Sequence, residues 1–139
     1  MRQGLRQAHT RREEEEEMNA PFALVVDDDH AVAALFQRAL QDAGYQTEVM
    51  DNGHKAQARL VFTTPDLVLL DLHIPNLPGE IILRQLRGQQ RFAGTRVIIT
   101  TGDAAALQRF SGLANQVVLK PIGYEQLRQL AEQYLPLSV

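Results

Sequence analysis

Three aspartates stand at the ends of two short apolar runs. FALVV, residues 22–26, is followed directly by Asp27 and Asp28, and LVLL, residues 67–70, is followed by Asp71. A carboxylate in such a place can serve as a nucleophile or as a ligand of a hard divalent cation. Each aspartate alone also has a structural explanation, because strands often end at a polar loop residue and aspartate often caps a helix.

Two more polar residues follow apolar runs in the same way. Thr101 comes after residues 97–100, and Lys120 comes after residues 116–119. If these runs are parallel strands, their carboxyl ends lie on one edge of the sheet, where such folds place their chemistry. Close carboxylates raise one another's pKa unless cations compensate them. Lys120 supplies one positive charge, and Mg²⁺, which accepts carboxylate, carbonyl and water oxygens, suits the remainder.

The order of elements predicts the fold that would bring these residues together. Short apolar segments predict five buried strands, at residues 22–26, 46–50, 67–70, 97–100 and 116–119. Helical patterns separate and follow them, at residues 32–43, 53–63, 80–86, 104–110 and 124–134. Strands that alternate with helices predict an α/β fold with a doubly wound, five-stranded parallel sheet. The fourth helix is expected to be short or irregular.

Composition limits the class of protein. The chain has 139 residues, 45% of them hydrophobic, no cysteine and a formal net charge of -3. Cysteine nucleophiles and disulfides are therefore excluded, and no apolar run approaches the roughly 20 residues of a membrane-spanning helix. Residues 1–20, with four arginines and a run of five glutamates, are expected to form a disordered tail before a domain at 21–139. We expect a cytoplasmic protein that binds neither membrane nor nucleic acid.

Four motifs, in this order, resemble a known family. VVDDD at 25–29, LLDLHIP at 69–75, ITTG at 99–102 and LKP at 119–121 together are similar to the receiver domain of bacterial two-component response regulators. Each motif alone is weak, but each one stands at the end of an expected strand. The resemblance covers residues 22–135 and implies a flavodoxin-like (βα)5 receiver fold in a single-domain, stand-alone regulator.

The resemblance also implies a role for each strand-end residue. Asp71 would be the phosphoacceptor, and Mg²⁺ would be held by Asp27, Asp28, Asp71 and the backbone carbonyl of His73. Thr101 would hydrogen-bond the new phosphoryl oxygens. Lys120 would pair with Asp71 or with its phosphoryl group. The peptide bond from Lys120 to Pro121 is expected to be cis.

Three features depart from the family pattern. The interval from Thr101 to Lys120 is short, and Val117 occupies the place where many receivers carry an aromatic residue that switches position. His73 and Asp103 lie two residues after the expected phosphoacceptor and after Thr101, at places where the family tunes loss of the phosphoryl group. Asp103 could orient the attacking water or cap the helix at Ala104, and the capping role is favoured.

The leading functional hypothesis is a receiver that accepts a phosphoryl group from a sensor histidine kinase or a phosphotransfer protein. It would signal through a downstream protein target, either as a monomer or as a phosphorylation-dependent dimer. A pseudo-receiver, which binds partners without phosphorylation, is the second hypothesis. A phosphatase with an aspartate nucleophile ranks last, because such enzymes place a second aspartate where this chain has His73. Apart from its own phosphotransfer and dephosphorylation, the domain is not expected to be an enzyme.

Overall fold

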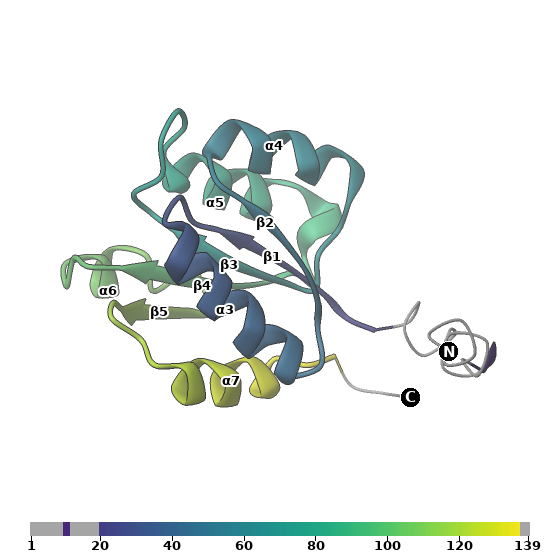
Figure 1. The fold of residues 1–139 in the computed structure, drawn as a ribbon. Coiled ribbons are helices and arrows are strands. Elements are labelled where there is room, and N and C mark those ends of the chain that lie inside the picture. Colours follow the sequence, from purple (N-terminus) through teal and green to yellow (C-terminus); the bar gives the residue numbers. More distant parts are fainter. Residues whose placement is uncertain (1–9, 12–19, 137–139) are drawn as a thin grey trace.

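The computed structural model describes residues 10–11 and 20–136, and its centre is a parallel sheet. The strand order is β2-β1-β3-β4-β5, so that the chain winds in both directions from β1 (Figure 1). The strands are β1 (Phe22–Val26), β2 (Gln46–Met50), β3 (Leu67–Asp71), β4 (Arg96–Thr101) and β5 (Gln116–Leu119). The flavodoxin-like α/β fold expected from the sequence is confirmed.

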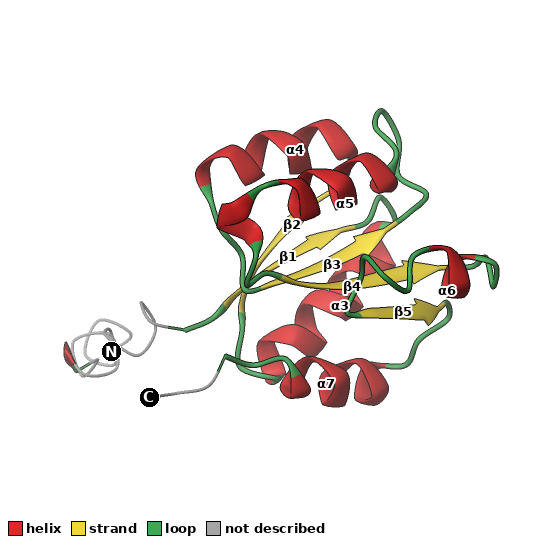
Figure 2. Ribbon diagram, turned by 180° about the vertical axis from the view of Figure 1, so that it is seen from behind, coloured by secondary structure: helices red, strands yellow, loops and turns green. Residues whose placement is uncertain are grey.

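Helices cover both faces of this sheet. They are α3 (His30–Asp42), α4 (Gly53–Phe62), α5 (Gly79–Gly88), the 3-10 helix η1 (Gln90–Phe92), α6 (Ala106–Arg109) and α7 (Tyr124–Gln133). α3 and α7 lie side by side on one face, and α4 and α5 lie on the other (Figure 1, Figure 2). Because all five strands are parallel, their carboxyl ends lie along one edge of the sheet.

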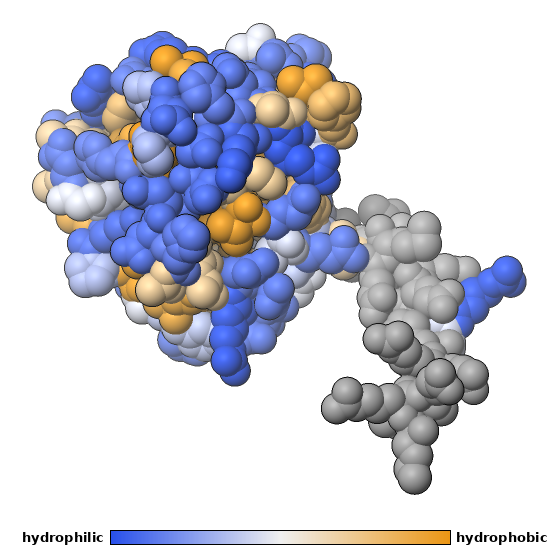
Figure 3. Space-filling view, turned by 45° about the horizontal axis from the view of Figure 1, so that its top comes forward, coloured by the Kyte–Doolittle hydropathy of each residue, from blue (hydrophilic) through white to orange (hydrophobic). Residues whose placement is uncertain are grey.

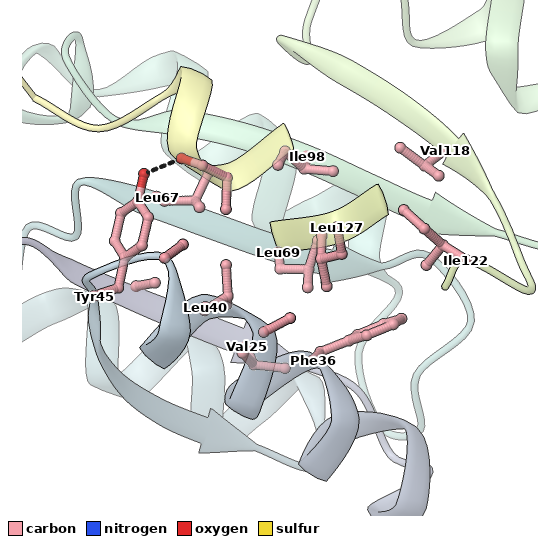
Figure 4. Packing of buried hydrophobic residues seen from close by; sticks show 14 of the residues in the cluster. Val25, Phe36, Leu40, Tyr45, Leu67, Leu69, Ile98, Val118, Ile122 and Leu127 are labelled. Carbon is pink, nitrogen blue, oxygen red and sulfur yellow. Dashed lines mark hydrogen bonds between the residues drawn. The ribbon is translucent and has the colours of Figure 1, made fainter. Parts of the chain in front are cut away.

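Alternate residues of each central strand pack into two separate hydrophobic cores, one on each face of the sheet. Figure 4 shows the core under α3 and α7, where Val25, Leu69 and Ile98 from three strands meet Phe36 and Leu127 from the helices. The neighbouring strand residues point to the opposite face and pack against α4 and α5. Burial on both faces explains why these strands read as continuous apolar runs rather than as alternating ones.

Local sequence signals set the ends of the first helix. The Asp29 carboxylate accepts hydrogen bonds from the backbone N–H groups of Ala31 and Val32, which caps α3. Gly44 ends the segment with a φ of 112°, a left-handed conformation that glycine adopts without strain. α3 thus begins at His30, two residues before its first expected apolar position, and carries Asp28 and Asp29 at its start.

The remaining element ends agree with expectation except around η1 and α6. The fourth helix, α6, is confirmed as short, with four residues from Ala106 to Arg109. It begins two residues later than the expected start at Ala104. The 3-10 helix at Gln90–Phe92 was not expected, because its single turn is too short to show a period.

The face of the described residues that Figure 3 shows is mainly hydrophilic. In Figure 3, apolar side chains on the visible face form small separate groups among hydrophilic ones. Within residues 10–11 and 20–136, no helix has the length and hydropathy to cross a bilayer. The expected disordered tail, apart from Thr10, Arg11 and Ala20, lies outside the described residues, so that expectation stays a prediction.

Candidate functional site

Three aspartates converge at the carboxyl edge of the sheet. Each of Asp27, Asp28 and Asp71 offers one carboxylate oxygen, and these three oxygens lie within 4.8 Å of one another. Asp27 and Asp71 are buried, while Asp28 is exposed. β1 and β3 are hydrogen-bonded neighbours in register, with Val26 opposite Leu70, so the residues after them come together. The sequence prediction that these side chains meet is confirmed by the geometry.

Lys120 provides the positive charge of this cluster. Its Nζ donates hydrogen bonds to Asp27 Oδ2 at 2.8 Å and to Asp71 Oδ2 at 3.2 Å. The Phe36 ring lies below the ammonium, with the centroid 5.9 Å from Nζ. The Lys120–Pro121 bond is cis, as expected. The side chain therefore reaches from the end of β5 across β4 and β3 to the residue that follows β1.

The charges of the cluster are strongly coupled. Burial raises the pKa of Asp71 above its ordinary value, and the charge of Asp27 adds to this, although the His73 N–H and Lys120 oppose it. Burial by itself would lower the pKa of Lys120, but its hydrogen bonds to the two carboxylates outweigh burial and raise that pKa. Two buried carboxylates thus share one ammonium, and a further cation would reduce their repulsion.

The loop after β3 is held tightly against the site. The His73 N–H donates to Asp71 Oδ1 at 3.0 Å, which orients the carboxylate. A Cβ atom at Gly79 would lie 2.6 Å from the Asp71 carbonyl oxygen, so only glycine allows α5 to begin so close to this backbone. The same loop also approaches the start of α4, where a Cβ at Gly53 would lie 2.4 Å from the carbonyl oxygen of the loop residue Leu77. Sequence reasoning missed both glycines as determinants of the site.

Thr101 lies at the same edge, but among the described residues no hydrogen bond joins its hydroxyl to a carboxylate. Its buried Oγ1 accepts a hydrogen bond from the Asp103 N–H at 3.1 Å, and its carbonyl oxygen accepts one from the Lys120 N–H at 2.8 Å. Asp103 Oδ1 accepts from the Ala105 N–H, which closes a turn before α6 rather than capping the helix at Ala104. A cavity of about 210 Å³ connects Thr101 with His73 and Asp103.

The segment between α6 and β5 is anchored by Arg87, which the sequence reading did not single out. Its guanidinium donates to the carbonyl oxygens of Leu113 at 2.7 Å and Thr95 at 2.9 Å, and to Asn115 Oδ1 at 3.0 Å. Asn115 Oδ1 also accepts from the Val97 N–H at 2.8 Å. These contacts tie the start of β5, and hence the position of Lys120 beyond it, to the end of α5.

Comparison with known proteins agrees with this geometry. The model of the response regulator receiver domain family matches residues 23–132, which include every residue of the cluster and all five strands except Phe22, the first residue of β1. The chain belongs to this family. The recognition made from the four sequence motifs is thereby confirmed.

The relatives of this chain differ in the share of their own length that the chain covers. Sporulation initiation phosphotransferase F of Bacillus subtilis (strain 168) is 34% identical over 118 residues, which are 83% of this chain and 94% of that protein. The DNA-binding dual master transcriptional regulator RpaA of Synechocystis sp. is 33% identical over 110 residues, 77% of this chain. The chain spans only 46% of the length of RpaA.

Solved receiver domains share the fold. The signal receiver domain of a signal transduction histidine kinase from Syntrophus aciditrophicus has a TM-score of 0.74 and 30% identity, covering 84% of this chain and 90% of that one. The chemotaxis response regulator CheY4 of Vibrio cholerae has a TM-score of 0.75 and 24% identity, covering 83% of this chain and 98% of that one, and shows likeness in fold alone. In the present chain, Val117 is half-buried and packs against the hydrophobic core under α4 and α5.

Proposed function

We propose that this receiver domain accepts a phosphoryl group on Asp71 from a phosphohistidine of a partner protein. The observation that carries the proposal is the placement of Asp71: its buried carboxylate is oriented by the His73 N–H and faces Lys120, beside two more carboxylates. Burial weakens the solvation of this carboxylate, which favours its use as a nucleophile.

The acidic residues fit a magnesium ion. Three carboxylate oxygens within 4.8 Å of one another are hard ligands, and the exposed Asp28 leaves the cluster open to water and to phosphate oxygens. Asp27, Asp28 and Asp71 would hold Mg²⁺, with the backbone carbonyl of His73 as a fourth protein ligand. When bound, the ion neutralises charge on the transferred phosphoryl group.

The chain's own residues position the reactants. An Asp71 carboxylate oxygen attacks phosphorus, the P–N bond of the phosphohistidine breaks, and the electron pair leaves with the imidazole, which takes up a proton. Lys120, now hydrogen-bonded to Asp71 Oδ2, moves to an oxygen of the phosphoryl group while it retains Asp27. Thr101 exchanges its hydrogen bond from Asp103 for one to the phosphoryl oxygens. Placement and charge stabilisation account for the reaction.

The partners follow from the same chemistry. A sensor histidine kinase or a phosphotransfer protein supplies the phosphohistidine, and the family relative named as a phosphotransferase supports such a relay for this chain. A downstream protein would read the phosphorylated surface, in the cytoplasm. The alternative is a pseudo-receiver. Val117, which has no aromatic ring, and the four-residue α6 favour that alternative for the output step.

Intact-mass measurement tests the proposal. The protein is incubated with Mg²⁺ and acetyl phosphate, with Asp71→Asn as the inactive variant and Asp103→Asn as a matched control at the same edge. We expect one phosphoryl group on wild type and on Asp103→Asn, and none on Asp71→Asn. Absence of any gain in the folded wild-type protein would favour the pseudo-receiver instead.

A further inference from the structure

Thr100 carries a buried hydroxyl without a hydrogen-bond partner. The structure buries three threonines in or next to β4, namely Thr95, Thr100 and Thr101. The hydroxyl of Thr95 donates to the Pro65 carbonyl oxygen at 2.7 Å, and that of Thr101 accepts from Asp103. Thr100 Oγ1 has no partner within the part of the chain that the structure describes, although only 1% of the residue is exposed.

This hydroxyl has an energetic cost that a valine would avoid. Burying a hydroxyl without a partner destabilises the folded state, and valine has nearly the same shape without a polar atom. Two of its neighbours on this face are apolar, namely Ile98 two residues earlier on β4 and Val118 opposite Thr100 on β5. Packing alone therefore does not explain a threonine here, and a buried polar group of this kind calls for a functional partner.

The sheet register places that partner next to it. Thr100 is the β4 residue directly opposite Asp71 on β3. Residues that face each other in a parallel pair point to the same side of the sheet, so the side chains of Thr100 and Asp71 lie on one face of it. In the structure Asp71 Oδ1 accepts a hydrogen bond from the His73 N–H and Oδ2 accepts one from Lys120, and Thr100 Oγ1 bonds neither oxygen. When Lys120 leaves Oδ2, that oxygen loses its donor on the face of the sheet that Thr100 shares.

We propose that Thr100 is a positioning residue that hydrogen-bonds Asp71 once Lys120 has moved to the phosphoryl group. This inference rests on the proposed phosphorylation of Asp71. A rotation about χ1 of Thr100 breaks no existing hydrogen bond, because its hydroxyl has none among the described residues. The hydroxyl then donates to the Asp71 oxygen that lost the ammonium.

The hydrogen bond from Thr100 to Asp71 accelerates hydrolysis of the acyl phosphate. Water attacks phosphorus, the bond from phosphorus to the Asp71 oxygen breaks, the electron pair stays on the Asp71 carboxylate, and the proton of the water goes to inorganic phosphate. Negative charge grows on Asp71 during this step, so a donor aimed at Asp71 binds the transition state more tightly than the ground state. Thr100 therefore shortens the lifetime of the phosphorylated protein.

Two matched pairs of variants test this role. Thr100→Val keeps the shape of the side chain and removes the hydroxyl, whereas Thr100→Ser keeps the hydroxyl; Thr100→Ala differs from Thr100→Ser by the hydroxyl alone. Each protein is phosphorylated with Mg²⁺ and acetyl phosphate, freed of the donor, and followed by intact mass. Loss of one hydrogen bond predicts phosphoryl loss about three- to ten-fold slower in the Val and Ala variants, and a near wild-type rate in the Ser variant.

A second readout separates this role from a structural one. In urea unfolding of the unphosphorylated proteins, Thr100→Val should be as stable as wild type or more stable, because it removes an unpaired hydroxyl. Equal rates of phosphoryl loss in all four proteins, or faster loss in the Val and Ala variants, would overturn the Thr100 proposal alone. Failure of wild type to gain a phosphoryl group would overturn the proposed function, and the role of Thr100 with it.

Discussion

Lys120 Nζ lies closer to Asp27 than to Asp71, at 2.8 Å against 3.2 Å. Asp27 is 1% exposed, and the only cation that the structure pairs with it among the described residues is Lys120. Lys120 can therefore release Asp71 and remain anchored. Lys120 can thus keep its hydrogen bond to Asp27 while it exchanges the one to Asp71 for another acceptor.

Stability should depend on pH through Asp71. Its folded pKa is raised above the ordinary value of 3.8, so the folded protein binds more protons than the unfolded chain between these two pKa values. The contribution of Asp71 to stability is present below the unfolded pKa and is lost as pH rises through the folded pKa. Asp71→Asn should thus be more stable than wild type at neutral pH, and the difference should shrink as pH falls through the folded pKa and be smallest below the ordinary value of 3.8. Urea unfolding across pH in the absence of Mg²⁺ measures this, and a difference independent of pH would contradict it.

Magnesium binding should separate two adjacent aspartates. Asp28 belongs to the acidic cluster, whereas Asp29 caps α3. Asp28→Asn should weaken Mg²⁺ binding by at least about ten-fold, because a charged ligand is lost. Asp29→Asn should bind Mg²⁺ nearly as wild type does, because asparagine caps a helix equally well. Isothermal titration calorimetry compares the two, and equal dissociation constants would refute the assignment of Asp28.

Two glycines of α5 should respond in opposite ways to alanine. At Gly79 a Cβ would lie 2.6 Å from the Asp71 carbonyl oxygen and 2.9 Å from Leu72 Cα, whereas at Gly88 it would meet nothing within 4 Å. Gly79→Ala should cost about 1–3 kcal/mol of unfolding free energy, because backbone must move. Gly88→Ala should be neutral or should stabilise by about 0.5–1 kcal/mol. Chemical unfolding measures both, and a harmless Gly79→Ala would disprove the close approach.

Arg87 should matter far more than its neighbour Arg84. Arg87→Met leaves three acceptors without their donor and should cost about 2 kcal/mol or more. Arg84 has a side chain that is 66% exposed and pairs with Glu80, so Arg84→Met should cost less than about 0.5 kcal/mol. Hydrogen exchange supplies a local readout. The Asn115 amide, which donates to the Val97 carbonyl oxygen, should exchange faster in Arg87→Met only; unchanged exchange would show that Arg87 does not anchor this segment.

The sheet and the acidic cluster could be predicted because they depend on patterns that sequence displays. Strands buried on both faces are continuous apolar runs, and parallel strands end at one edge, so Asp27, Asp71 and Lys120 had to approach one another. The reach of Lys120 across β4 followed from the same topology. The family match supports the recognition but not the role of each residue, and those roles stay predictions until they are measured.

The rest could not be predicted because it depends on distances between segments far apart in the chain. Gly79 looks like an ordinary loop glycine until α5 is seen against the Asp71 backbone. The contacts of Arg87 join residues that are 8 to 28 positions apart, with no local signal. From the sequence, Thr100 is an ordinary β-branched residue of a predicted strand, and only the strand register shows that it lies opposite Asp71. The start of α6 shifted because the Asp103 carboxylate closes a turn instead of capping a helix.

The most direct test of the central claim is to locate the phosphoryl group in the chain. Borohydride reduces an aspartyl phosphate to homoserine, which tandem mass spectrometry assigns to one position. After treatment with Mg²⁺ and acetyl phosphate, reduction should give homoserine at position 71 and at no other aspartate. Homoserine at position 27, 28 or 103, or its absence from a protein that has gained a phosphoryl group, would contradict the assignment of Asp71 as the phosphoacceptor.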